Sequence, residues 1–135
     1  MPGIDDFIRP KEWTSDLQTQ MRAAVRKWAE ERLRPIVEHV DEDWKEHKLV
    51  EPLLKEVLVD LGLNGAFFPA EFGGQDMPED EYMALTSIVC EELSRIDAGF
   101  ATAAICSVWG LVPILLKPTR NMALLEEFAP KFCGS

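Results

Sequence analysis

The feature that most constrains this sequence is the stretch from Ala98 to Leu116, which carries no charged residue between Asp97 and Lys117. As a helix it would be apolar on every face and about 28 Å long, enough to cross the hydrocarbon core of a bilayer. Pro113 would break the hydrogen-bond ladder inside lipid, with no second span to repair it. We therefore expect a buried helix and no membrane span, with part of the helix's cover supplied by another domain or subunit.

Charge and cysteine content exclude several classes of function. The 135 residues have a formal charge of −10, from 24 acidic and 14 basic side chains, so a basic surface for nucleic acid or anionic membranes is not expected. The three cysteines, Cys90, Cys106 and Cys133, are odd in number and widely spaced, which argues against a disulfide framework and against a zinc site. The N-terminus lacks the pattern of a signal peptide, and we expect a cytoplasmic protein.

Apolar residues repeat at helical spacing through most of the chain, and no segment alternates like a strand. Residues 1–14 contain two prolines and a glycine and are expected to form an extended arm. Ser15 and Gln18 form a possible capping box for a long helix, kinked at Pro35, that ends near residue 46.

Further helices are expected over residues 51–61, 79–95 and 98–116, the last one capped by Asp97. The hydroxyl of Thr119 is placed to cap a final helix that runs up to Pro130. The predicted fold is therefore an all-α bundle of about five or six helices, formed by a single domain over residues 15–135.

Residues 62–78 lose this periodicity. Glycines and prolines punctuate a sequence that contains Phe67, Phe68 and Phe72, and these side chains must be buried somewhere. We therefore expect an ordered loop that packs onto the helices or onto whatever binds them. Gly73-Gly74 lacks the third glycine and the preceding strand of a dinucleotide-binding loop.

Two patterns resemble sites of chemistry, and we favour a structural interpretation of both. His39, Asp43 and His47 have the spacing of one helix face, but the outer two would lie about 12 Å apart along the axis, too far to share an ion. We expect a solvated polar face and no metal. Cys106 has no base beside it in sequence, and its apolar neighbours should raise the pKa of the thiol, so we expect it to pack.

Three short motifs occur in a fixed order. Residues 68–74 read Phe-Pro-Ala-Glu-Phe-Gly-Gly, residues 91–97 read Glu-Glu-Leu-Ser-Arg-Ile-Asp, and residues 129–131 read Ala-Pro-Lys. With the small-residue helix over 98–116, they resemble the Pro-Glu-aromatic-Gly-Gly loop, the acidic helix end and the Leu-Pro-Lys signature of one family. The sequence from about residue 17 to 135 is similar to the N-terminal helical domain of the acyl-CoA dehydrogenases.

The resemblance implies a function. A complete acyl-CoA dehydrogenase adds a middle β-domain that holds much of the FAD and a C-terminal helical domain that carries the catalytic glutamate. That glutamate removes the α-proton of the acyl-CoA thioester while a hydride passes from the β-carbon to the flavin. The chain alone is therefore expected to contain no catalytic residue and to be inactive. Its implied partners are the acyl-CoA substrate, an electron-transfer flavoprotein, the two further domains and other copies in a homo-oligomer.

The resemblance also implies that helix 98–116 forms a wall of the acyl pocket. Ala101, Thr102, Ile105 and Cys106 are the positions that would face the acyl chain, together with Trp109. Simple core packing is the alternative for each of them. Ile105 and Trp109 are bulky for a pocket wall, which leaves open the substrate's size and relatives that are oxidases or monooxygenases.

The family pattern is not complete. Pro118 stands where the family usually has glycine, and Arg120 and Asn121 stand where it has acidic residues. A second interpretation is a free-standing helical interaction or structural module that kept the bundle without enzyme activity. The composition alone does not separate the two.

Overall fold

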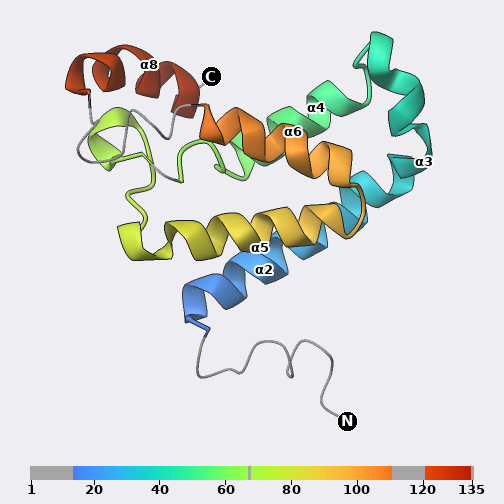
Figure 1. Ribbon diagram of the computed structural model, residues 1–135, viewed down its shortest axis with the longest axis horizontal. Coiled ribbons are helices and arrows are strands. Elements are labelled where there is room, and N and C mark those ends of the chain that lie inside the picture. Colours follow the sequence, from blue (N-terminus) through green and yellow to red (C-terminus); the bar gives the residue numbers. More distant parts are fainter. Residues whose placement is uncertain (1–13, 67, 111–120, 135) are drawn as a thin grey trace.

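The computed structural model describes residues 14–66, 68–110 and 121–134, and every regular element within these ranges is helical (Figure 1). The all-α prediction is therefore confirmed. None of the helices so described combines the length and apolarity needed to cross a membrane. The expected arm over residues 1–14 lies outside these ranges except for Thr14. The elements, in chain order, are α2 (Asp16–Trp28), η2 (Ala29–Leu33), η3 (Arg34–Ile36), α3 (Val37–Val40), η4 (Asp41–Lys45), α4 (Val50–Lys55), η5 (Glu56–Asp60), η6 (Ala70–Phe72), η7 (Glu79–Glu81), α5 (Tyr82–Ser94), α6 (Ala98–Trp109) and α8 (Met122–Gly134).

The expected long helix at the start is present and irregular, because π-helical η2 and 3-10 helical η3 interrupt it around Pro35. Ser15 caps α2, and its Oγ accepts a hydrogen bond from the backbone N–H of Gln18 at 3.1 Å. The Gln18 side chain does not complete the capping box. Its Nε2 donates instead to Glu81 Oε2 at 2.6 Å and so ties α2 to η7.

Asp43 is buried, so the expectation of a solvated side chain is wrong for this residue. Its carboxylate accepts hydrogen bonds from the backbone N–H groups of Lys48, Leu49 and Val50, at 2.8–3.0 Å, where α4 begins. Burial raises the pKa of Asp43, but these three bonds outweigh it and keep the pKa below its ordinary value. Asp43 therefore acts as a cap for α4 across a turn in which His47 adopts φ +53°.

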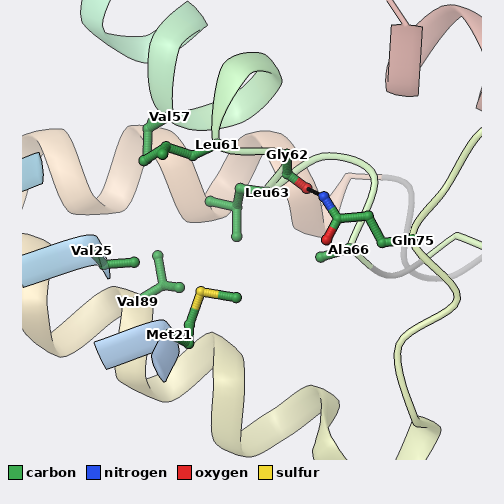
Figure 2. A pocket seen from close by; sticks show the side chains of 9 residues that line it. All are labelled: Met21, Val25, Val57, Leu61, Gly62, Leu63, Ala66, Gln75 and Val89. Atoms are coloured by element: carbon green, nitrogen blue, oxygen red, sulfur yellow. Dashed lines mark hydrogen bonds between the residues drawn. The ribbon is translucent and has the colours of Figure 1, made fainter. Parts of the chain in front are cut away.

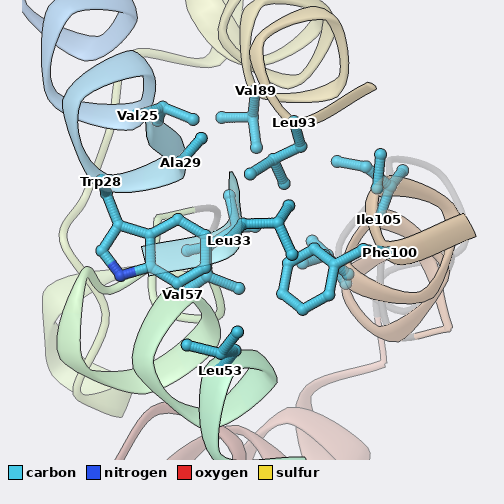
Figure 3. Packing of buried hydrophobic residues seen from close by; sticks show 14 of the residues in the cluster. Val25, Trp28, Ala29, Leu33, Leu53, Val57, Val89, Leu93, Phe100 and Ile105 are labelled. Carbon is cyan, nitrogen blue, oxygen red and sulfur yellow. The ribbon is translucent and has the colours of Figure 1, made fainter. Parts of the chain in front are cut away.

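α2, α4, α5 and α6 pack around one apolar core, in which side chains from all four regions meet (Figure 3). At its centre the rings of Trp28 and Phe100 lie 5.9 Å apart between centroids. The indole Nε1 of Trp28 donates to Glu56 Oε2 at 3.2 Å, which satisfies the polar edge of the ring. The buried members of this main core are Val25, Trp28, Ala29, Leu33, Leu53, Val57, Leu63, Ala66, Val89, Leu93, Phe100, Ala101, Ala104, Ile105 and Val108.

Residues 62–78 form an ordered loop over the positions described, as the sequence predicts. Gly73 ends η6 in the left-handed region at φ +88°. Gly74 packs so closely that a Cβ there would lie 1.9 Å from the carbonyl oxygen of Phe68. The backbone N–H of Asp76 donates to that same carbonyl at 3.0 Å, which closes the loop upon itself.

The loop packs against α8 and forms a second, smaller core. The rings of Phe68 and Phe132 lie 5.8 Å apart between centroids. Phe67 lies outside the described residues. The buried members of this second core are Phe68, Phe72, Leu125 and Ala129, with Phe132 and Cys133 partly buried beside them.

α8 differs from the sequence prediction at its C-terminal end. The expected cap, Thr119, lies outside the described residues, and Asn121 Oδ1 accepts a hydrogen bond from the backbone N–H of Leu124 at 3.2 Å. The helix does not end at Pro130 but continues to Gly134. We attribute this to packing of its last turn on the second core, which offsets the backbone hydrogen bond that proline cannot donate.

A buried ionic cluster joins α2 to α5. The side chain of Glu92 on α5 is 1% exposed, and it accepts hydrogen bonds from Arg26 at 2.8 and 2.9 Å and from Arg22 at 2.5 Å. Arg95 adds a longer bond of 3.3 Å. Burial raises the pKa of Glu92, but the bonds from Arg26 and Arg22 outweigh it and hold the pKa below its ordinary value of 4.5.

Glu92→Gln should lower the free energy of unfolding by about 2 kcal/mol at pH 7, because two arginines lose their buried partner. The pKa of Glu92 is lowered by folding, so its stabilisation is complete above the ordinary value of 4.5 and is lost as the pH falls through the folded-state pKa. The difference between wild type and variant should therefore shrink below pH 4.5. Urea unfolding followed by circular dichroism across this pH range measures it.

Glu91→Gln is the matched control for that experiment, since the Glu91 carboxylate is 45% exposed and binds Arg22 at 3.1 Å on the surface. An exposed pair of this kind contributes less than about 1 kcal/mol. If both variants lose the same free energy of unfolding, the burial of Glu92 does not increase its contribution to stability.

Candidate functional site

α6 has a buried face and an exposed face. The helix starts at Asp97, whose Oδ1 accepts a hydrogen bond from the backbone N–H of Phe100 at 2.5 Å, as the sequence predicts. One face of the helix then packs into the main core. The opposite face is exposed and ends at Trp109, which is 52% exposed. The buried residues of α6 are Phe100, Ala101, Ala104, Ile105 and Val108.

The five predicted site residues fall on both faces of this helix. Thr102, Cys106 and Trp109 are exposed, and their spacing of four and three residues aligns them in one stripe along the outer face. Ala101 and Ile105 are buried in the main core instead, and Ile105 belongs to the same apolar cluster as Leu93 and Phe100 (Figure 3). The structure therefore brings three of the five together on an open surface and places the other two directly behind it.

Cys106 is exposed, so the expectation that it packs in apolar surroundings is wrong within this chain. It shares the outer face with Thr102, whose Oγ1 donates to the carbonyl oxygen of Ala98 at 2.8 Å. The described residues of α6 include no acid and no base. The stripe formed by Thr102, Cys106 and Trp109 can therefore pack against an apolar group, and it carries no carboxylate, imidazole or amine.

A small apolar pocket lies between α2, α5, η5 and the start of the loop (Figure 2). Its volume of about 20 Å³ holds roughly one water molecule, which is far too small for an acyl chain. Gln75 closes one side of it, where its Nε2 donates to the carbonyl oxygen of Gly62 at 3.1 Å. The pocket is lined by Met21, Val25, Val57, Leu61, Gly62, Leu63, Ala66, Gln75 and Val89.

The polar residues that the sequence offered as a metal site or a phosphate-binding loop lie away from α6. Within the ranges the structure describes, no three histidine, cysteine or acidic side chains are arranged to hold a metal ion. Asp43 is occupied by backbone N–H groups, whereas His39 and His47 are exposed. Gly73-Gly74 does not fit a flavin pyrophosphate, because the carbonyl of Phe68 fills the space beside Gly74.

Sequence reasoning missed the roles of Asp43 and Glu92, which position the helices. For Glu92 a signal was present. It follows Ile88 and Val89 at helical spacing on α5, so it lies on the face that is otherwise buried and apolar. A charge at such a position indicates a buried ionic partner.

Comparisons with known proteins identify the family of this chain. Residues 15–130 match the family described as "Acyl-CoA dehydrogenase, N-terminal domain". Cyclohexane-1-carbonyl-CoA dehydrogenase of Syntrophus aciditrophicus is 30% identical over 122 residues, which are 90% of this chain and 29% of the relative. A probable acyl-CoA dehydrogenase of Mycobacterium tuberculosis is 29% identical over 124 residues, 90% of this chain and 28% of the relative.

A more distant relative is the mitochondrial short/branched chain specific acyl-CoA dehydrogenase of Rattus norvegicus, 29% identical over 103 residues, which are 76% of this chain and 22% of the relative. The chain thus spans less than a third of the length of these relatives. No solved structure matches it significantly. On the match over residues 15–130, the chain belongs to the acyl-CoA dehydrogenase family and corresponds to its N-terminal domain.

Proposed function

We propose that this chain is the N-terminal domain of an FAD-dependent acyl-CoA dehydrogenase that desaturates an acyl-CoA thioester between its α and β carbons. The observation that carries the proposal is the family match over residues 15–130. Two relatives with this domain are named for acyl-CoA or for a carbonyl-CoA substrate. The exposed, uncharged face of α6 supports it, because such a surface suits the apolar part of a thioester.

In this proposal the outer face of α6 is one wall of the acyl pocket, and the rest of the enzyme supplies the other walls. Thr102 and Cys106 have small side chains that leave room for an acyl chain. Trp109 lies about 10 Å further along the helix from Thr102 and limits how far the chain reaches. Ala101 and Ile105 form a second layer that supports the wall from the main core.

The contribution of this chain is binding and orientation. The described part of α6 carries no carboxylate, imidazole or amine. In this proposal the group that removes the α-proton belongs to another part of the enzyme. Bound FAD would supply the hydride acceptor of the reaction, and an electron-transfer flavoprotein is the proposed partner that would take up its electrons. The residues on the outer face of α6 would hold the acyl chain and exclude water from it. The enzyme is proposed to be a homo-oligomer.

The isolated chain is expected to retain no FAD and to oxidise no acyl-CoA, because in this proposal the catalytic base and the pyrophosphate site belong to other parts of the enzyme. Absorbance in the flavin bands after purification, and after incubation with added FAD followed by gel filtration, measures this. If the purified chain carries one FAD per molecule, the proposal that other domains bind the cofactor is wrong.

The isolated chain is also expected to bind an apolar dye and to self-associate through the stripe on α6, because its indole is left open to solvent. Trp109→Gln should then reduce dye fluorescence and light scattering. Met83→Gln is the control, since Met83 is 71% exposed on α5 and away from the stripe. If both substitutions have the same effect, or if the chain is monomeric and binds no dye, the stripe is not an uncovered interface.

In the complete enzyme, Cys106→Phe should narrow the pocket and lower kcat/KM for long acyl-CoAs relative to short ones by about tenfold or more, at about 0.8 kcal/mol for each excluded methylene. Ile105→Ala should have the opposite, smaller effect and also lower the melting temperature. Val108→Ala is the control, because Val108 is buried on the same helix but outside the proposed wall. It should lower the melting temperature and leave the chain-length profile unchanged.

The profile for Ile105→Ala decides the role of that residue. If kcat/KM falls equally for all chain lengths, Ile105 is a core residue only. If Cys106→Phe also leaves the profile unchanged, the outer face of α6 does not contact the acyl chain.

A further inference from the structure

The loop and α8 have a core of their own. Among the described residues, none belongs both to the main core and to the second core of Phe68, Phe72, Leu125 and Ala129. In Figure 1, α8 lies over the loop and η6, beside the stack formed by α2, α5 and α6. We call residues 68–76 together with α8 the loop–α8 unit.

Several contacts hold this unit together internally. The rings of Phe68 and Phe132 lie 5.8 Å apart, and a Cβ added to Gly73 would touch the Cβ of Cys133 at 3.7 Å. Within the loop, the backbone N–H of Asp76 donates to Phe68. Because these contacts join the loop to the last turn of α8, the two segments should move as one body.

Asn64 and Gln75 lie where the unit meets the rest of the bundle. The backbone N–H of Gln75 donates to the carbonyl oxygen of Gly65 at 2.8 Å, and its Nε2 donates to that of Gly62 at 3.1 Å, so this side of the unit is the hinge. Asn64 joins the bundle to α8. Its backbone N–H donates to the carbonyl oxygen of Leu58 in η5 at 2.9 Å, so its main chain belongs to the bundle. Its side-chain Nδ2 donates to the carbonyl oxygen of Phe132 at 3.3 Å, so its side chain reaches α8. A donor–acceptor distance of 3.3 Å is beyond the usual range for an N–H···O bond, and this link is weak.

The other end of the same amide is unsatisfied. Asn64 is 7% exposed, and its Oδ1 has no hydrogen-bond partner among the described residues. A buried carbonyl oxygen without a partner destabilises the closed arrangement relative to one in which water reaches it. Rotating the amide by 180° does not help, because Oδ1 would then face the carbonyl oxygen of Phe132.

From the separate cores and the weak bond between Asn64 and α8, we propose that the loop–α8 unit opens from the helical bundle as one body while the bundle stays folded, with Asn64 holding it closed. Opening returns the Asn64 amide to water and separates the carbonyl of Phe132 from it. The inference concerns the chain itself and does not depend on the proposed enzyme activity.

Hydrogen exchange of the full chain, measured by mass spectrometry at low urea concentrations, tests the proposal. Peptides covering 122–132 and 68–76 should exchange together, at least about tenfold faster than peptides of α5, and with a weaker dependence on urea. If these peptides and those of α5 share one rate and one urea dependence, the unit does not open separately.

Asn64→Asp tests whether Asn64 holds the unit closed. At pH 7 it replaces the buried amide by a charge that faces the carbonyl of Phe132, so exchange in the loop–α8 unit should rise a further tenfold or more, with exchange in α5 unchanged within about twofold. Asn121→Asp is the matched control, because it makes the same chemical change at the exposed cap of α8, where an acceptor is kept and a negative charge is favourable. It should not speed exchange.

Two results would overturn the role of Asn64. Equal acceleration in α5 and in the unit would mean that the substitution loosens the whole bundle. Unchanged exchange in the unit would mean that the amide does not hold it closed.

Discussion

The carboxylate of Glu92 lies inside the contact between α2 and α5, where Arg22 and Arg26 both donate to it. Taking a charge out of water costs several kcal/mol, and the arginines offset that cost only when the two helices meet in one register. α5 then places Val89 and Leu93 against the inner face of α6. The ionic contact between α2 and α5 therefore helps to decide which side of α6 is exposed.

A second set of ionic contacts lies around the two π-helical segments. Arg32 in η2 binds Glu56, the first residue of η5, at 2.5 and 2.9 Å. Glu30 in η2 accepts hydrogen bonds from Arg34 and from Arg95, which lower its pKa to about 2. Arg95 also reaches Glu92, so the surface pairs and the buried cluster are connected. π-helical turns widen the backbone locally, and here their acidic side chains link neighbouring helices.

Local signals in the sequence predicted much of the fold. The caps at Ser15 and Asp97 depend on residues three positions away, and both were read correctly. The burial of Glu92 has a local signal in its spacing from Ile88 and Val89, but its partners are arginines 66 and 70 positions away, which no local pattern identifies. The two faces of α6 could not be separated either, because a segment that is apolar all round has no periodicity to show which side its own chain covers. The sequence therefore places the candidate site on α6, whereas the exposure of Cys106 and the burial of Ile105 required the structure.

The close approach of Gly74 to the carbonyl of Phe68 has a consequence for how the sequence of this region can drift during evolution. The bend is held by main-chain atoms, which substitutions elsewhere in the loop leave unchanged. Ala70 is exposed within it, and a larger side chain there meets only solvent. Gly74 cannot vary, since the Cβ of any other residue would collide with the backbone carbonyl of Phe68. We therefore expect distant members of the family to keep a glycine at this position wherever the loop follows the same backbone path, whatever substrate each enzyme uses.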